Sequence, residues 1–303
     1  MKFEVTILGS SSATPIFNRN PTSQVLNINE RLLMIDCGEG TQQQMLRYGI
    51  KYHKIEHIFI SHLHGDHFFG LVGLISSMNL NGRKRPLHLF GPEKLMDILN
   101  VQFEHSDTHI NFPIAFKAIK PGSTELIFET NDFTVETIPL NHRIPCSGFI
   151  FKEKQRLRKV LKDKIAELEI PANYVPLLKK GIDFTDKNGK VHKAIDLTVE
   201  ADEPKAYAYC SDTVCDWTYI NQIYHVDTLY HEATFMHDMV DRAKATFHTT
   251  CQEAGEVAKK VGAKKLLIGH FSARYRDLSP LLIEARSVFP ESYLANEGET
   301  FVI

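Results

Sequence analysis

Four side chains of the kinds that bind metal ions stand within six positions and form the motif His62-x-His64-x-Asp66-His67. Neutral imidazole and carboxylate are the usual nitrogen and oxygen ligands of zinc, which they hold at about 2.0–2.2 Å. The motif directly follows the apolar segment 57–60, and a loop at a strand end can turn alternate side chains toward a common point. His62 and His64 can then share one metal ion while Asp66 and His67 share another, so the motif predicts a metal centre.

Two metal ions need more ligands than one loop offers. The remaining candidates also follow predicted strands, and they are His142, Asp212 and His270. Metal ions about 3.5–4 Å apart can hold a nucleophile and a phosphoryl oxygen together, and zinc lowers the pKa of bound water toward about 7. Two Zn²⁺, two carboxylates, one hydroxide and neutral histidines leave a formal charge of about +1, which suits a phosphodiester monoanion. The set therefore favours phosphoryl transfer.

Strands and helices must bring these loops together. Runs rich in β-branched and aromatic residues predict strands over residues 3–8, 23–29, 31–36, 57–60, 87–90, 114–119, 125–129, 133–139, 206–210, 228–232 and 265–268. Helices are expected over 41–48 and 68–78, after Gly91-Pro92, and from Thr250, which has capping-box spacing to Glu253, to about Val261. Strands interleaved with helices favour an α/β fold whose sheets are covered by helices.

The composition limits the partners and the cellular location. The 303 residues are 43% hydrophobic and carry a net charge of −2, which excludes intrinsic disorder and a uniformly basic nucleic-acid coat. Five scattered cysteines without a CxxC pair are typical of reduced thiols. No apolar run approaches the ~18 residues that a membrane span requires, and the N-terminus lacks the apolar region of a signal peptide. We expect a cytoplasmic protein with no membrane partner.

One segment differs in charge from the rest of the chain. Residues 152–193 contain twelve Lys/Arg, among them Lys179 and Lys180, against six Asp/Glu, so the segment carries +6 and the rest carries −8. Charge runs are usually solvated surface. This run lies between His142 and Asp212, and we expect it to form a surface insertion.

Several further motifs make the chain resemble the ribonuclease Z branch of the metallo-β-lactamase superfamily. Together with the metal ligands they run from about Leu8 to Tyr275, and they comprise Asp36-Cys37-Gly38-Glu39-Gly40-Thr41-Gln42, the RKRPLHLFGP stretch of residues 83–92, His231-Glu232-Ala233-Thr234, His248-Thr249-Thr250 and His270-Phe271-Ser272-Ala273-Arg274-Tyr275. The resemblance implies an α/β protein with an αββα sandwich. It implies one domain over residues 1–303, an inserted substrate-binding arm at 150–198, and a homodimer.

The same resemblance implies a ligand set for two Zn²⁺ per subunit. The expected ligands are His62, His64 and His142 for the first ion, Asp66, His67 and His270 for the second, and Asp212 as the bridge between them. Histidine and carboxylate ligands also accept Mn²⁺ and Fe²⁺.

Three residues are expected to be catalytic. Asp66 has a second role here, since a carboxylate beside the attacking water can orient it or take its proton. The leaving 3′ oxygen needs a proton in turn, and the resemblance implies that Glu232 and His248 act at this end of the reaction. We interpret them as a carboxylate–imidazole pair in which Glu232 orients and charges His248.

Other residues are expected to support the substrate or the ligands. Arg274 can clamp a phosphate, and Lys179 and Lys180 can contact the RNA backbone from the arm. Asp36 is expected to orient a ligand histidine through its second ring nitrogen.

Two stretches depart from the family pattern. Phe17 stands where lysine is common, in a loop that the family associates with discrimination against a mature CCA end. The arm lacks the usual Gly-Pro hinge and has Pro171 and Pro176 in the corresponding stretch, which leaves the shape of the arm open.

Together these features predict a zinc-dependent endoribonuclease that removes the 3′ trailer from precursor tRNA. It would leave a 3′-hydroxyl on the tRNA and a 5′-phosphate on the trailer, and no DNA partner is expected. One alternative is a broader RNA exonuclease or a small-molecule phosphodiesterase on the same metal site. Another is an RNA-binding scaffold without metals, against which the complete set of seven ligands speaks.

Overall fold

The computed structural model describes residues 2–16 and 18–303, so Phe17 lies outside the described residues. The chain divides into two compact units. The first comprises Met1–Glu129, Val135–Phe151 and Ala206–Ile303, and the second comprises Thr130–Thr134 and Lys152–Lys205.

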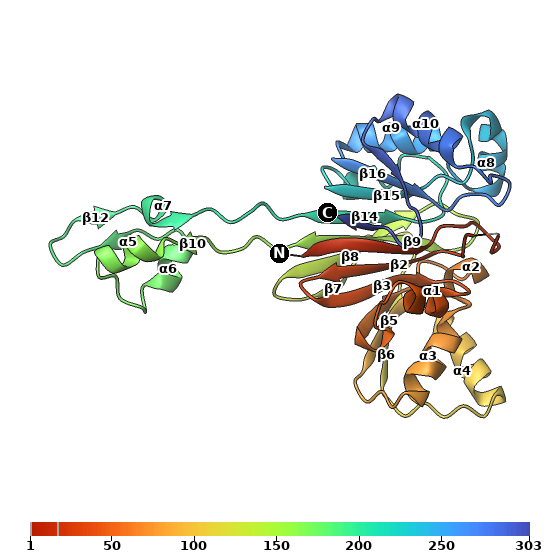
Figure 1. Ribbon diagram of the computed structural model, residues 1–303, viewed down its shortest axis with the longest axis horizontal. Coiled ribbons are helices and arrows are strands. Elements are labelled where there is room, and N and C mark those ends of the chain that lie inside the picture. The colour runs from red at the N-terminus through yellow and green to blue at the C-terminus, as the bar shows by residue number, and fades with distance from the viewer. Residues whose placement is uncertain (1, 17) are drawn as a thin grey trace. The chain divides into compact units, whose positions relative to one another are not determined.

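The first unit contains two seven-stranded sheets (Figure 1). The first sheet consists of β1 (Phe3–Gly9), β2 (Ser23–Ile28), β3 (Arg31–Cys37), β4 (Ile55–Phe59), β5 (Leu87–Pro92), β6 (Ile114–Ile119) and β18 (Thr300–Val302). Their order is β18-β1-β2-β3-β4-β5-β6. The pairs from β18 to β3 are antiparallel, whereas β3, β4, β5 and β6 run parallel.

The second sheet has the order β17-β16-β15-β14-β9-β8-β7. Its strands are β7 (Leu126–Glu129), β8 (Phe133–Leu140), β9 (Cys146–Glu153), β14 (Ala206–Cys210), β15 (Thr228–Glu232), β16 (Lys265–Gly269) and β17 (Ser292–Leu294). The last four run parallel to one another. Phe59 of the first sheet lies with its ring 5.6 Å from that of Phe149 and 5.5 Å from that of Phe151 in β9, so the two sheets pack face to face.

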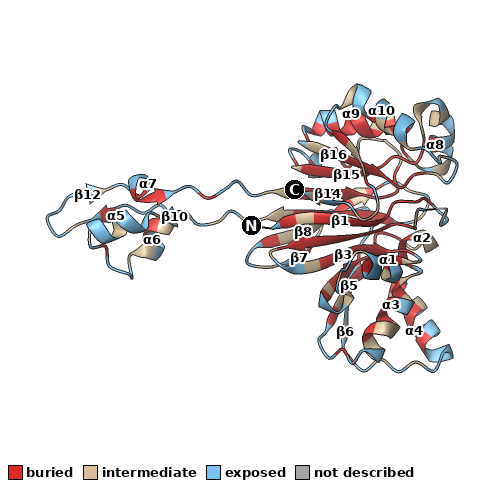
Figure 2. Ribbon diagram, in the orientation of Figure 1, coloured by how far each residue is buried: buried red, intermediate tan, exposed pale blue. Residues whose placement is uncertain are grey.

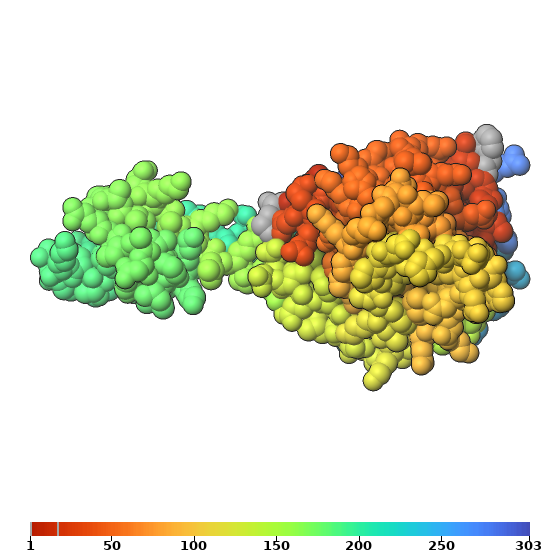
Figure 3. Space-filling view, turned by 90° about the horizontal axis from the view of Figure 1, so that it is seen from below, coloured from red at the N-terminus to blue at the C-terminus, as the bar shows by residue number. Residues whose placement is uncertain are grey.

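Helices cover the outer face of each sheet. The first sheet carries α1 (Thr41–Arg47), α2 (Gly65–Phe68), α3 (Leu71–Leu80) and α4 (Leu95–His105), and the second carries α8 (Val240–Thr246), α9 (Cys251–Val261) and α10 (Ser279–Val288). Figure 3 views the molecule from the side of α3 and α4, in orange and yellow. The strands between the helix layers are largely buried (Figure 2). The predicted αββα sandwich is therefore confirmed.

The packing explains where the sequence prediction was wrong about a helix. A single helix was expected over 68–78, but α2 and α3 are separate. Gly70 N donates to the carbonyl of Cys37, and a Cβ on Gly70 would lie 2.2 Å from the carbonyl oxygen of Gly38. The backbone of Gly70 thus packs directly on the end of β3, which only glycine permits.

Most predicted strands agree with the structure to within two residues. The segments at 114–119, 206–210 and 228–232 have the expected bounds, and Thr250 forms the expected capping box with Glu253. The prediction missed β9, α8, α10, β17 and β18. Short 3₁₀ helices also occur at η1 (Tyr52–Lys54), η2 (Ile220–Gln222) and η3 (His237–Met239).

The parallel strands place several loops at one edge of the sandwich. The carboxyl ends of parallel strands meet at a common edge, where α/β proteins usually bind their ligands. The loop of residues 61–67 follows β4, Asp212 follows β14, and His270 follows β16. This edge therefore gathers residues from separate parts of the chain.

The second unit has a small core of its own. It contains two two-stranded antiparallel sheets, β10 (Lys159–Val160) with β13 (Thr198–Val199) and the hairpin of β11 (Phe184–Thr185) with β12 (Val191–His192). It also contains the helices α5 (Lys162–Glu167), α6 (Val175–Lys179) and α7 (Ala194–Leu197). The buried apolar residues that form this core are Ile170, Leu178, Phe184, Ala194 and Leu197. No helix among the described residues of either unit has the length and apolar character needed to cross a bilayer.

Candidate metal centre

The structure brings all seven predicted ligands together at the carboxyl edge of the strands. The side chains form two groups, and within each group the nitrogen or oxygen atoms that could bind a metal ion lie within 4.8 Å of one another. The first group is His62, His64, His142 and Asp212. The second group is Asp66, His67 and His270. Asp212 and His270 also form such a group with His248. Histidine and aspartate side chains in this number and arrangement could hold metal ions.

The spacing within the first group fits a common ion. His64 Nδ1 lies 3.1 Å from His62 Nε2 and 3.2 Å from His142 Nε2. Four ligands at about 2.05 Å from a tetrahedral zinc ion lie about 3.3 Å from one another. The three imidazoles are therefore spaced as the ligands of one small cation would be.

The second group has the same spacing. His270 Nε2 lies 3.3 Å from Asp66 Oδ2 and 3.4 Å from His67 Nε2. Asp66 Oδ2 also accepts a hydrogen bond from the backbone N–H of Ala13 at 2.7 Å, which fixes the orientation of the carboxylate.

Asp212 faces both groups, one oxygen to each. Its Oδ2 lies 3.6 Å from His62 Nε2 and 3.8 Å from His142 Nε2. Its Oδ1 lies 3.4 Å from His67 Nε2 and 3.3 Å from His270 Nε2. This carboxylate is buried and has the position that a bridging ligand requires.

The outward ring nitrogens have hydrogen-bond partners that leave the inward nitrogens free to bind. His142 Nδ1 donates to the carbonyl of Phe247 at 2.9 Å, and His270 Nδ1 donates to Thr234 Oγ1 at 2.9 Å. A proton on Nδ1 leaves the lone pair on Nε2. In both histidines this lone pair points into the cluster, and a partner on the other ring nitrogen is usual for metal ligands.

Asp36 lies directly beneath the second group. Its Oδ2 accepts from His67 Nδ1 at 2.7 Å, from Ser61 Oγ at 2.8 Å and from Tyr209 OH at 2.7 Å, and its Oδ1 accepts from Ser61 N at 2.7 Å. The carboxylate is fully buried and fully hydrogen-bonded, with φ at +53°. From the sequence, Asp36 was expected to orient one of the ligand histidines, which was not specified, and in the structure its contact is with Nδ1 of His67.

The charge states of the side chains in the cluster also favour the binding of a cation. Burial lowers the pKa of His62, and it lowers the pKa of His64 to about 4, so both are neutral at pH 7. Burial acts in the same direction on His67, but the charges of Asp212, Asp66 and Asp36 outweigh it and raise its pKa to about 10. The carboxylates around His67 thus attract positive charge, which a divalent cation supplies more strongly than a proton.

Glu232 and His248 form a second pair beside the cluster. Glu232 Oε1 accepts from His248 Nδ1 at 2.9 Å and from Thr249 N at 3.0 Å, and Oε2 accepts from Thr234 Oγ1 at 2.7 Å. Burial opposes the charge on His248, but Glu232 outweighs burial and raises the pKa of His248 to about 9. His248 is therefore charged at neutral pH, with its second nitrogen left for another partner.

A cavity of about 390 Å³ opens onto the cluster. Its lining includes His64, Asp66, Asp212, His248 and His270. It also includes Phe69 and Arg143, which the sequence analysis missed. Phe69 is 64% exposed, and its ring lies so close to Gly65 that a Cβ on that glycine would be 2.2 Å from a ring carbon.

Other predicted residues lie away from this cavity. The guanidinium of Arg274 lies over the ring of Phe235, 5.3 Å from its centroid, and donates to Ser272 Oγ at 3.1 Å. Lys179 and Lys180 belong to the second unit, which holds no member of the cluster. His231 is buried with its Nε2 2.8 Å from Tyr219 OH, so its imidazole supports the core.

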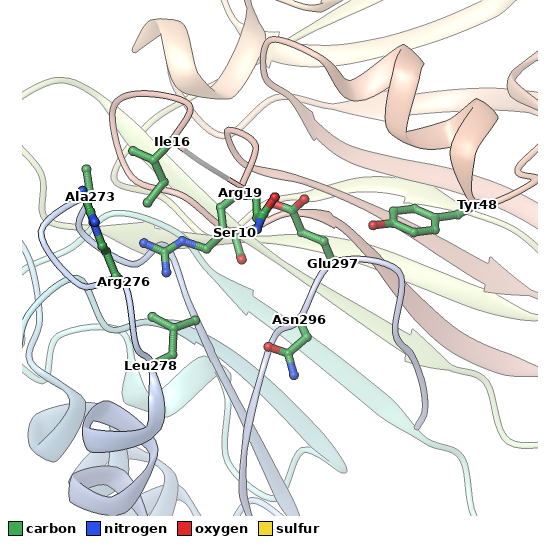
Figure 4. A pocket seen from close by; sticks show the side chains of 10 residues that line it. Ser10, Ile16, Arg19, Tyr48, Ala273, Arg276, Leu278, Asn296 and Glu297 are labelled. Atoms are coloured by element: carbon green, nitrogen blue, oxygen red, sulfur yellow. The ribbon is translucent and has the colours of Figure 1, made fainter.

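A second cavity, of about 850 Å³, is lined in part by the loop that connects β1 to β2 (Figure 4). Figure 4 shows Ile16, Arg19, Arg276, Leu278 and Glu297 among the side chains that line this cavity. Residues 12–15 of the same loop line the metal cavity. The loop thus contributes to both cavities.

Known proteins are similar to this chain over nearly its whole length. The ribonuclease Z of Phocaeicola vulgatus is 47% identical over 296 residues, which cover 98% of this chain and 96% of the relative. That of Cytophaga hutchinsonii is 48% identical over 304 residues, which cover 100% and 97%. The model of the family described as Anti-Pycsar protein Apyc1 matches residues 3–197.

Solved structures are similar over the same extent. The short form of human tRNase Z has a TM-score of 0.73 and 27% identity, with 99% of both chains covered. The metallo-β-lactamase fold protein YhfI of Bacillus subtilis has a TM-score of 0.69 and 19% identity, again with 99% of both chains covered, and shares the fold.

Proposed function

The chain belongs to the ribonuclease Z family and, over residues 3–197, to the family of Anti-Pycsar protein Apyc1, and we infer from this that it cleaves the 3′ trailer from precursor tRNA. The observation that carries the inference is the His/Asp cluster at the carboxyl edge of the strands in a chain 47% identical to a ribonuclease Z over nearly all its length. The products are a tRNA with a 3′-hydroxyl and a trailer with a 5′-phosphate.

We propose that the cluster holds two Zn²⁺. The spacing of the donors supports one ion among His62, His64 and His142 and one among Asp66, His67 and His270, with Asp212 between them. Such a pair of cations supplies Lewis acidity at the phosphoryl group and lowers the pKa of an attacking water.

The chain's own acids and bases act around this centre. The charges of His67 and His270 hold the pKa of Asp66 low although burial opposes them, so its carboxylate is ionised at neutral pH. An ionised carboxylate that lines the cavity can orient the attacking water or take its proton. On the other side, His248 carries a proton that it can give to the leaving 3′ oxygen. Glu232 keeps the imidazole charged and turned toward the cavity.

Replacement of His248 with alanine is expected to lower kcat on precursor tRNA by about 10²–10³-fold, because the alkoxide then leaves without a proton. The value of kcat on bis(p-nitrophenyl) phosphate should fall much less, because nitrophenolate is a good leaving group and needs no proton. Turnover of both substrates, measured with His105→Ala as the surface control, checks this. Equal losses on both substrates, with reduced zinc content, would instead make His248 a metal ligand.

The second unit is proposed to hold the tRNA body. The whole unit contains thirteen Lys/Arg against eleven Asp/Glu, so its net charge is only +2, and Arg158 and Lys159 pair with Glu200 and Asp202. Among the described residues of this unit, five lysines have no carboxylate within salt-bridge distance, namely Lys162, Lys179, Lys180, Lys190 and Lys193. These lysines are the candidates for phosphate contacts.

Three further features stay proposals. We propose that Arg274 contacts RNA outside the metal cavity, that the protein acts as a homodimer so that the arm of one subunit can serve the other, and that it works in the cytoplasm.

Incubation with a labelled precursor tRNA tests the function. We expect one internal cut at the start of the trailer, complete loss of cleavage after chelation, and recovery when Zn²⁺ is returned, since the histidines and carboxylates alone offer no strong Lewis acid. Product mapping on a sequencing gel makes the measurement. A ladder of products would favour the broader exonuclease, and cleavage that survives chelation would contradict a metal-dependent mechanism.

A further inference from the structure

Among the described residues that line the metal cavity, Arg143 is the one lysine or arginine. The other charged groups of the lining are the carboxylates Glu39, Asp66 and Asp212 and the histidines of the cluster. A phosphodiester that enters this cavity therefore has a single guanidinium to meet. Arginine binds two phosphate oxygens at once through its planar fork of donors.

In the structure Arg143 is held by a ligand of the cluster. Its Nε donates to His64 Nε2 at 3.2 Å, and its side chain is otherwise exposed at the mouth of the cavity. The opposite nitrogen of the same ring, His64 Nδ1, faces His62 Nε2 and His142 Nε2. One imidazole thus connects the arginine to the metal position.

A cation in the cluster removes the acceptor that Arg143 uses. A neutral imidazole has one N–H, and when Nδ1 gives its lone pair to a cation the proton must sit on Nε2. His64 Nε2 then becomes a donor that faces the N–H of Arg143. The two N–H groups repel one another, and so do the guanidinium and the bound cation, which are both positively charged. The guanidinium is therefore released toward the cavity.

We propose that Arg143 is the residue that clamps the scissile phosphate, and that it is freed for this role when the metal centre fills. The proposal rests on the proposed phosphodiesterase function and names the group that positions its substrate. Arg274, the candidate from the sequence, does not line the cavity and has its guanidinium over Phe235.

The test compares Arg143→Gln with Arg143→Lys and with Arg85→Gln. Arg85 is a matched control because its exposed guanidinium pairs with Glu56 just before β5, at the amino end of the sheet. Calorimetric titration with inorganic phosphate measures binding to the zinc-loaded and the chelated proteins. Competition with a chelator measures the affinity for zinc, and bis(p-nitrophenyl) phosphate gives kcat/KM.

In the zinc-loaded protein, Arg143→Gln should weaken phosphate binding and lower kcat/KM by about 10–100-fold, which is the usual contribution of a hydrogen bond to a charged group. Arg143→Lys should recover part of both, and Arg85→Gln should change neither. The zinc affinity of Arg143→Gln should be equal to or higher than that of the wild type. In the chelated proteins the substitution should have no effect on phosphate binding.

Two outcomes would overturn the proposal. Unchanged phosphate binding in zinc-loaded Arg143→Gln would show that Arg143 does not touch the anion, and a weaker affinity for zinc would show that it supports His64 instead. Failure of the wild type to cut precursor tRNA, with an Arg143-dependent phosphate site still present, would overturn the tRNA function and leave the clamp standing.

Discussion

Asp66→Ala is expected to abolish cleavage of precursor tRNA, with a loss of at least about 10⁴-fold in the single-turnover rate, while RNA affinity changes by less than about threefold. The variant removes a carboxylate that lies 3.3 Å from His270 Nε2 and 3.6 Å from His67 Nε2, and with it both a proposed metal ligand and a proton acceptor. Affinity should persist because most of the proposed phosphate contacts are made by lysines of the second unit, away from the cluster. Rapid-quench cleavage and gel-shift titration of the same labelled precursor measure the two effects.

Two comparisons separate this result from a folding defect. Asp97→Ala removes an exposed carboxylate of α4 and should leave both quantities unchanged. Asp66→Asn keeps an oxygen that can accept from Ala13 N, so its thermal midpoint should stay close to that of the wild type while its activity is still lost. Activity within tenfold of wild type in either Asp66 variant would remove Asp66 from the mechanism.

The ends of the strands were predictable because they depend on local patterns. The segment 206–210 is a short run of alanine, tyrosine and cysteine, and 228–232 has Leu229 and Tyr230 at its centre; the structure reproduces the bounds of both. By contrast β9 was missed, although its buried segment Phe149–Phe151 is apolar and aromatic. Its neighbours β8 and β14 are far apart from each other in sequence, and the sequence shows nothing about which strands pair.

The cluster itself was predictable for a related reason. The ligands lie one to eight residues after the end of a strand, and parallel strands end at one edge, so the positions in sequence already imply proximity. The supporting contacts had no such signal. Arg143 reaches His64, and Thr234 links Glu232 to His270, through side-chain directions that depend on the packed fold. His270 even adopts a φ of +59°, which no local pattern predicts.

The count of charges along the sequence overstated the positive charge that the arm can offer to RNA. The +6 of residues 152–193 comes largely from residues 152–159, which carry five Lys/Arg and one Asp/Glu. In the structure the end of this segment lies beside the acidic stretch 200–203, where Glu200 pairs with Arg158 at 3.5 Å and Asp202 with Lys159 at 3.7 Å. Charges that pair with each other across the two ends of the insertion attract an external phosphate only weakly. The lysines without such partners therefore matter more for RNA binding than the net charge of the insertion.

Removal of residues 155–203 is expected to lower the affinity for precursor tRNA by about 10²–10³-fold and to flatten its salt dependence, because the five lysines without carboxylate partners are lost. Hydrolysis of bis(p-nitrophenyl) phosphate should stay within about threefold of wild type, since every member of the cluster lies in the first unit. Gel-shift titration over a range of salt concentrations measures the RNA affinity and its salt dependence. Turnover of bis(p-nitrophenyl) phosphate measures the hydrolytic activity.

The deletion leaves ends that can be joined. Glu153 N donates to the carbonyl of Lys205 at 2.8 Å, so a short Gly-Ser turn can connect residue 154 to residue 204 while β9 and β14 stay paired. A full-length variant with Lys162, Lys179, Lys180, Lys190 and Lys193 changed to glutamine serves as the matched comparison, because it removes the charge and keeps the unit. If phosphate contacts explain the arm, this variant should reproduce most of the loss in affinity. If it binds as wild type does while the deletion does not, the arm acts through its shape, as proteins that recognise double-helical RNA largely do.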